Sequence, residues 1–77
     1  MYVYQQFMLN RTLVKKVFVA SENNDHEHCV MCGVKFSPYT GDIQLGYVTQ
    51  DNGHWVCPDC YIEYHEEYNW KVLEQIL

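Results

Sequence analysis

Basic residues are scarce in this sequence. It has five Lys and Arg against ten Asp and Glu, which gives a formal charge of −5. Nucleic-acid binding depends on Lys and Arg that replace the counterions of phosphates, so nucleic acid is not the expected partner. Three of the five basic residues, Arg11, Lys15 and Lys16, lie near the start of the chain, where we expect a solvated face.

Long apolar runs are also missing. No stretch approaches the roughly 18 apolar residues that a membrane-spanning helix needs. The first residues lack the charged segment followed by an apolar run that marks a secretory signal. We therefore expect a cytoplasmic protein that does not span a membrane.

The chain has little length with which to build a core. Its 77 residues are expected to form one domain, 1–77, whose small core needs an additional stabilising element such as a metal. Aromatic residues are plentiful, with seven Tyr, three Phe and two Trp. Rings rather than aliphatic side chains should therefore dominate the core.

All four cysteines lie in two Cys-x-x-Cys knuckles, Cys29 with Cys32 and Cys57 with Cys60, separated by 24 residues. Two such turns facing each other offer four thiolates to a tetrahedral ion, so the sequence predicts a structural Zn²⁺ site. In a reducing compartment a metal explains the four cysteines better than disulfides do, although a secreted chain could pair them.

Histidines offer an alternative ligand set. His26 and His28 are next to Cys29, and His54 and His65 lie further along. Because four cysteines complete a tetrahedron, we expect His26 and His28 to be solvent-exposed or hydrogen-bonded to a thiolate, and His65 to be packed or capping. A site of three cysteines and one histidine is the alternative.

The N-terminal segment, 1–21, is predicted to be a β-rich extension. Residues 2–9 and 13–20 are rich in aromatic and β-branched types, which favours two strands of a hairpin. The polar, acidic residues 21–27 should be a loop that leads into the first knuckle.

The middle of the chain contains turn signals. Gly33 is expected to have a positive φ after the first knuckle, and the breaker-rich residues 37–42 should be irregular. Residues 43–50 and 54–56 are predicted strands, and the Asn52-Gly53 pair between them suits a type I′ hairpin turn.

A helix is predicted to start at Pro58, which suits the first helical position, with Asp59 near the positive end of the helix dipole. We expect it to extend over 58–76, with an earlier end near Asn69 as the alternative. Aromatic residues should pack one stripe onto the hairpin, and acids should point outward. These two sets are Tyr61, Tyr64, His65, Tyr68 and Val72, and Glu63, Glu66 and Glu67. The apolar residues after 70 would bury against the N-terminal hairpin or in a homodimer formed through this helix.

The order of knuckle, hairpin and knuckle joined to a helix resembles the treble-clef zinc fold over a zinc-binding core at 29–68. The resemblance implies a small α+β fold with a zinc knuckle, a β-hairpin and a C-terminal α-helix. The pattern from His26 to Cys57, with Lys35-Phe36-Ser37, Gly41-Asp42 and His54-Trp55, is also similar to short bacterial proteins of unknown function. The knuckles alone resemble those of rubredoxin, an iron electron carrier, but here a predicted helix follows the second one.

These patterns predict a structural zinc protein that binds another protein, and not an enzyme, because a closed four-thiolate site leaves no ligand position for a substrate. The partner would have a basic surface. It would contact the acidic helix face or an aromatic surface made of Tyr39, Tyr47 and Trp55. A nucleic-acid-binding zinc ribbon and a rubredoxin-like iron carrier are the alternatives.

Overall fold

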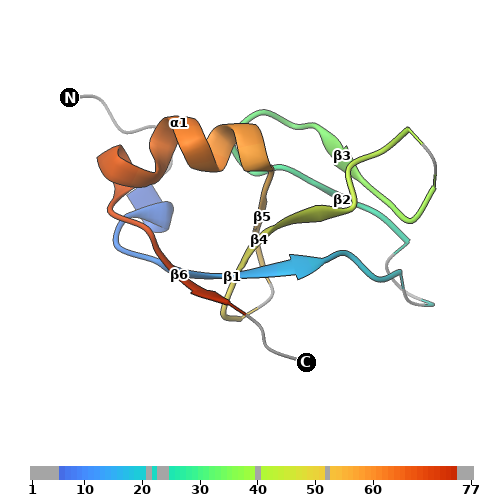
Figure 1. Cartoon of the computed structure of the whole chain (residues 1–77), viewed down its shortest axis with the longest axis horizontal. Coiled ribbons are helices and arrows are strands. Elements are labelled where there is room, and N and C mark those ends of the chain that lie inside the picture. The colour runs from blue at the N-terminus through green and yellow to red at the C-terminus, as the bar shows by residue number, and fades with distance from the viewer. Residues whose placement is uncertain (1–5, 21, 23–24, 40, 52, 75–77) are drawn as a thin grey trace.

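The computed structural model describes residues 6–20, 22, 25–39, 41–51 and 53–74. This part of the chain is a small α+β fold with one α-helix and two β-sheets, the class that was predicted (Figure 1). In chain order the elements are η1 (Gln6–Met8), β1 (Thr12–Val17), β2 (Glu27–His28), β3 (Lys35–Phe36), β4 (Leu45–Thr49), β5 (Trp55–Val56), α1 (Pro58–Tyr68) and β6 (Lys71–Glu74). No helix within these described ranges is long and apolar enough to cross a membrane.

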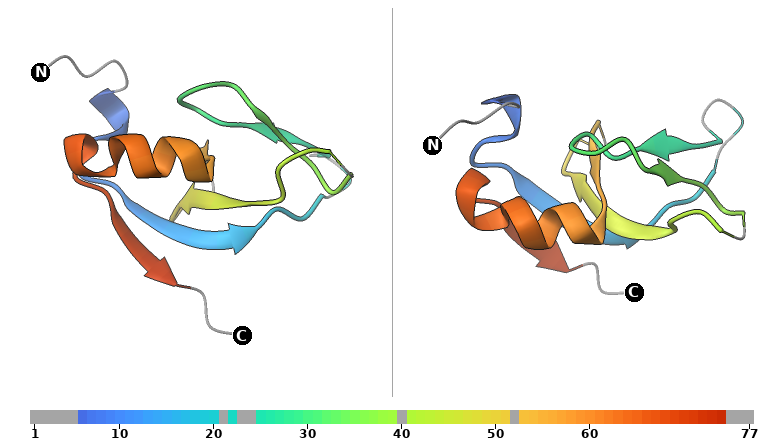
Figure 2. Two further views of the ribbon diagram at one scale, coloured as in Figure 1. Left: turned by 45° about the horizontal axis from the view of Figure 1, so that its top comes forward. Right: turned by 90° about the horizontal axis from the view of Figure 1, so that it is seen from above.

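The larger sheet has the strand order β5-β4-β1-β6. Strand β4 is antiparallel to both β5 and β1, whereas β6 runs parallel to β1. The smaller sheet is the antiparallel pair β2 and β3. Helix α1 lies over one side of the larger sheet, where the rings of Tyr61 and Tyr47 stack with centroids 4.1 Å apart (Figure 2).

The prediction of an N-terminal hairpin is wrong. Strand β1 overlaps the predicted run 13–20, but residues 6–8 form a 3₁₀ turn, and residues 1–5 lie outside the described ranges. Asn10 turns the chain with a φ of 59°, and its N–H donates to the carbonyl of Tyr68. The partners of β1 are therefore β4 and β6, and the N-terminal segment supplies an inner strand of the sheet rather than an extension.

The helix predicted over 58–76 ends at Tyr68. Asn69 takes the left-handed conformation, with φ 56° and ψ 49°, and its N–H donates to the carbonyl of Glu66. Residues 71–74 then form β6, which pairs with β1 from Thr12↔Lys71 to Lys15↔Glu74. The segment expected to form a dimer helix is thus an edge strand. It pairs with β1 of the N-terminal segment and not with a hairpin, and Leu73 stays 51% exposed, so the predicted burial of these residues is not reproduced.

The predicted β-hairpin in the middle of the chain is present, formed by β4 and β5 with Val48 opposite Trp55. The predicted type I′ turn at Asn52-Gly53 is wrong, because the Thr49 N–H donates to the His54 carbonyl and four residues, 50–53, therefore connect the strands instead of two. Asn52 itself lies outside the described residues. In the loop between β4 and β5, the Asp51 carboxylate accepts hydrogen bonds from the Thr49 hydroxyl and from the Gly53 N–H. Residues 37–39 and 41–42 are irregular, as predicted.

Aromatic rings fill the core, as the composition predicted. Phe18 and Phe36 pack against Trp55 with ring centroids 5.5 and 5.1 Å away. Further along, Tyr68 packs on Trp70 at 5.2 Å. All five rings are buried. The same core contains three cysteines, Cys29, Cys57 and Cys60, which places the knuckles inside the hydrophobic cluster.

Candidate metal centre

The four cysteines of the two knuckles meet at one point. Their Sγ atoms all lie within 4.8 Å of one another, and Cys32 Sγ is 3.7 Å from Cys57 Sγ. All four are free thiols and none is joined in a disulfide. Among the described residues this is the group of potential ligands that could hold a metal ion.

The first knuckle is the turn between β2 and β3. The N–H of Gly33 donates to the Cys29 carbonyl at 2.8 Å, and the N–H of Cys29 donates to the Val34 carbonyl at 2.8 Å. Gly33 has a φ of 85°, as predicted, which lets the chain reverse without steric cost. The turn directs the Met31 N–H to Cys29 Sγ at 3.4 Å.

The second knuckle joins β5 to the helix. Cys57 is the N-cap of α1 in an extended conformation, and its Sγ accepts a hydrogen bond from the Cys60 N–H at 3.4 Å. Pro58 occupies the start of the helix, where its missing N–H costs nothing. Both sulfur atoms thus lie at the positive end of the helix dipole, which stabilises thiolates.

Backbone contacts bring the two knuckles together. Cys29 forms a parallel bridge with Trp55, and the Val30 N–H donates to the Trp55 carbonyl at 2.8 Å. The N–H of Cys57 then donates to Cys29 Sγ at 3.4 Å. These contacts span more than one knuckle, so the local sequence pattern gave no sign of them.

The three buried thiols differ in their tendency to ionise. Burial opposes ionisation of Cys29, but the N–H groups of Cys57, Cys32 and Met31 outweigh it, so the pKa of Cys29 is lowered. Burial raises the pKa of Cys57 and that of Cys60. A bound cation would supply the positive charge that the buried sulfur atoms lack, and its binding would release their protons.

The donor set fits a tetrahedral soft or borderline ion. Four thiolates at the usual Zn–S distance of about 2.3 Å lie about 3.8 Å from one another. The 3.7 Å separation of Cys32 and Cys57 matches this value, and the 4.8 Å limit for the whole set needs only a small contraction. Four sulfur donors suit zinc or iron and fit magnesium or calcium poorly.

The histidines form other contacts. His26 Nδ1 lies 2.7 Å from the Asp25 carboxylate, and His28 Nδ1 lies 3.0 Å from the Gly33 carbonyl oxygen. Both side chains are exposed, which was one of the two predicted roles. The ring of His65 stacks on Tyr61 at 4.9 Å, in agreement with the predicted packing, and the ring of His54 lies 4.8 Å from Phe7.

The surfaces proposed for recognition are altered by the fold. Trp55 is only 5% exposed and belongs to the core, so it cannot contribute to the expected aromatic surface. Tyr47 is half-buried under Tyr61, whereas Tyr39 is exposed. Of the basic residues, Arg11 lies 3.7 Å from Asp51, and Lys16 lies over the Trp55 ring.

The chain matches no protein-family model, no curated protein and no solved structure.

Proposed function

We propose that this chain is a small structural zinc module that binds another protein. The observation that carries the proposal is the convergence of four cysteine sulfur atoms within 4.8 Å, where the two sheets meet the helix. Cys29, Cys32, Cys57 and Cys60 would hold the ion, which would contribute part of the folding free energy. A site closed by four thiolates leaves no position for a substrate, so the proposed role is structural and not enzymatic.

The arrangement of elements supports a treble-clef architecture for the metal-binding part. The first cysteine pair lies in the β2–β3 turn, the β4–β5 hairpin follows, and the second pair lies at the start of α1. This is the order expected from the sequence. The larger sheet adds β1 and β6 beside the hairpin.

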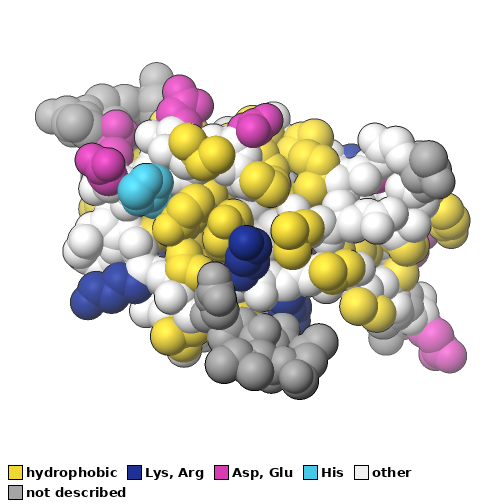
Figure 3. Space-filling view, viewed as in Figure 1, with side chains coloured by type: hydrophobic (Ala, Val, Ile, Leu, Met, Phe, Trp, Pro, Cys, Tyr) yellow, Lys and Arg dark blue, Asp and Glu magenta, His cyan; other side chains and the backbone are white. Residues whose placement is uncertain are grey.

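The outer side of α1 is the proposed docking face. Ile62 is 71% exposed and lines a shallow depression with Glu63, Glu66 and Glu67. Acidic side chains gather over α1 along the upper edge of the molecule (Figure 3). An apolar side chain surrounded by carboxylates suits a protein partner with basic residues around an apolar contact.

Metal analysis with cobalt substitution tests the structural site. We expect one zinc ion per chain in the purified protein. We also expect the protein with Co²⁺ in place of zinc to show the intense absorption of tetrahedral thiolate coordination. A coloured protein that contains iron would instead favour the rubredoxin-like alternative. Absence of any thiolate-bound metal under reducing conditions would overturn the proposal.

Affinity purification tests the docking face. The wild-type protein is compared with a variant that carries Glu63→Gln, Glu66→Gln and Glu67→Gln. The matched control is Glu22→Gln, an exposed acid outside the helix. We expect the helix variant to lose a basic partner that the control retains. Equal recovery of that partner with both variants would contradict the assignment of this face.

A further inference from the structure

Two exposed imidazoles lie side by side next to the first knuckle. In the sequence His26-Glu27-His28 the histidines are two residues apart, and His28 is in β2. Alternate residues of an extended chain project to the same side, so both rings lie on one side of this segment. Their ring centroids are 5.2 Å apart, with the planes at 85°.

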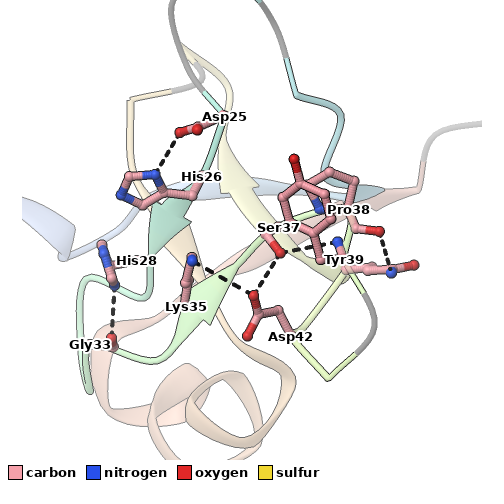
Figure 4. Close-up of polar contacts among 10 residues, drawn as sticks. Asp25, His26, His28, Gly33, Lys35, Ser37, Pro38, Tyr39 and Asp42 are labelled. Carbon is pink, nitrogen blue, oxygen red and sulfur yellow. Dashed lines mark hydrogen bonds and ion pairs between the residues drawn. The ribbon is translucent and has the colours of Figure 1, made fainter.

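Both rings are held by hydrogen bonds at the same nitrogen. The partner of His26 Nδ1 is a carboxylate oxygen of Asp25, and the partner of His28 Nδ1 is the Gly33 carbonyl oxygen. Because both partners are acceptors, the neutral rings have their proton on Nδ1 and a free lone pair on Nε2. Figure 4 shows these remaining nitrogens on the sides of the rings that face each other.

This arrangement matches how proteins prepare histidine ligands for a metal. A metal-binding imidazole usually donates its other N–H to a carboxylate or a backbone carbonyl, which fixes the ring and increases its basicity. Here the His26 ring has a carboxylate as its partner, and the His28 ring has a backbone carbonyl. The Gly33 carbonyl is itself fixed in the knuckle turn, whose hydrogen bonds join Cys29 to Gly33 and to Val34.

We propose that His26 and His28 form a second, exposed metal site, which binds a divalent transition ion through the two Nε2 atoms. Imidazole donors suit Ni²⁺, Cu²⁺ and Zn²⁺, and water would complete the coordination. The site is separate from the cysteine centre. It uses different donor atoms and does not require that the thiolates hold a metal.

Titration of the purified, zinc-loaded protein with Ni²⁺ tests this site. Calorimetry gives the stoichiometry, and NMR of the histidine side chains locates the ion through paramagnetic broadening. We expect one additional equivalent of Ni²⁺, with selective broadening of the His26 and His28 ring signals. His26→Ala and His28→Ala should each weaken binding by about tenfold or more, and Asp25→Asn should weaken it less.

His54→Ala is the matched control, since it also removes one imidazole, and it should leave Ni²⁺ binding unchanged. Circular dichroism verifies that each variant is folded. Full retention of Ni²⁺ binding by either His26→Ala or His28→Ala would overturn the proposal. So would absorption bands of Ni²⁺–thiolate coordination without broadening of the two rings. If the cysteine centre proved to hold no metal, the ring signals would still report on the histidine pair.

Discussion

Gly46 shows how strongly a single residue is constrained in this fold. It lies in β4 and is buried. A Cβ added there would come 2.7 Å from Cζ of the Phe36 ring and 2.9 Å from the Val56 carbonyl oxygen. The Phe36 ring is fully buried and packs on Trp55, so it has little room to move away. A glycine at this position allows β3 to close over β4.

Gly46→Ala should therefore destabilise the protein by about 1–3 kcal/mol through overpacking. Urea unfolding followed by fluorescence measures this. Phe36→Leu and the double variant complete a mutant cycle. We expect the double variant to lose less free energy of unfolding than the two single variants together, because the smaller side chain leaves room for the new methyl group. Strict additivity would contradict the proposed contact.

The four cysteines differ in burial but should be equally necessary as ligands. Cys29 is buried, whereas Cys32 is exposed. Cys29→Ser and Cys32→Ser should both abolish the cooperative fold in zinc-containing buffer, because metal binding contributes folding free energy. Circular dichroism and bound-metal analysis measure the outcome, with Val19→Ala at an exposed apolar position as the control. If Cys32→Ser kept the wild-type melting temperature, packing rather than metal binding would explain the cluster.

At the scale of elements, the conformation of Asn69 ends α1 and lets the chain turn into β6. Asn69 has a positive φ, and its side-chain amide donates to the Asn10 side chain at 2.8 Å. Asn10 also has a positive φ, so two left-handed asparagines lie together where the first strand and the helix meet. Asparagine and glycine tolerate this conformation better than other residues.

Asn69→Ala should lower the free energy of unfolding by about 1 kcal/mol, because alanine takes the left-handed conformation at a cost. Asn69→Gly is the matched control. It has no Cβ to strain, so it should retain more stability than the alanine variant although it also loses the contact with Asn10. Thermal unfolding compares the two variants. A glycine variant less stable than the alanine variant would show that backbone strain is not the main cause of the free energy of unfolding lost by Asn69→Ala.

At the scale of the whole molecule, residues far apart in the sequence close the fold. The indole N–H of Trp70 donates to the Met8 carbonyl at 2.7 Å, and both residues are buried. Next to this contact, β6 pairs in parallel with β1, and the Lys71 N–H donates to the Arg11 carbonyl. These contacts join the two ends of the described chain near the C-terminal end of α1, whereas Cys57 and Cys60 lie at its start.

Trp70→Phe should cost about 1–3 kcal/mol, because it leaves the buried Met8 carbonyl without its donor. Chemical unfolding monitored by circular dichroism measures the change. The protection of β6 amides from hydrogen exchange should fall with it, since this strand lies at the edge of the sheet. A free energy of unfolding within about 0.5 kcal/mol of wild type would contradict a stabilising role for this hydrogen bond.

Removal of the metal should unfold the whole domain rather than one loop. The cysteines come from the β2–β3 turn and from the start of α1, and Cys29, Cys57 and Cys60 belong to the core cluster, so the ion would cross-link these two parts of the chain within the core. Incubation with a strong chelator and a reductant should abolish the native circular dichroism spectrum, and added Zn²⁺ should restore it. An unchanged spectrum after verified loss of metal would refute the structural role.

Much of the local structure was predictable because local rules decide it. The turn after Cys32 needs a residue that tolerates positive φ, and Gly33 supplies one. Pro58 favours the start of a helix and so places Cys57 at its N-cap. The Cys-x-x-Cys spacing lets each turn present two sulfur atoms. For these reasons the candidate site and the beginning of α1 could be predicted from the sequence.

The sequence by itself thus determined which four cysteines come together, that aromatic rings fill the core, and that the fold is of the α+β class. Only the tertiary structure decided that β1 lies between β4 and β6, that Trp55 is buried, and that residues 71–74 are a strand. The physical reason is that strands pair through backbone hydrogen bonds between segments far apart in the sequence, and the side chains of one segment do not specify which other segment will be its partner. Residues 71–74 could continue a helix by their local preferences, and their pairing with β1 is what makes them a strand.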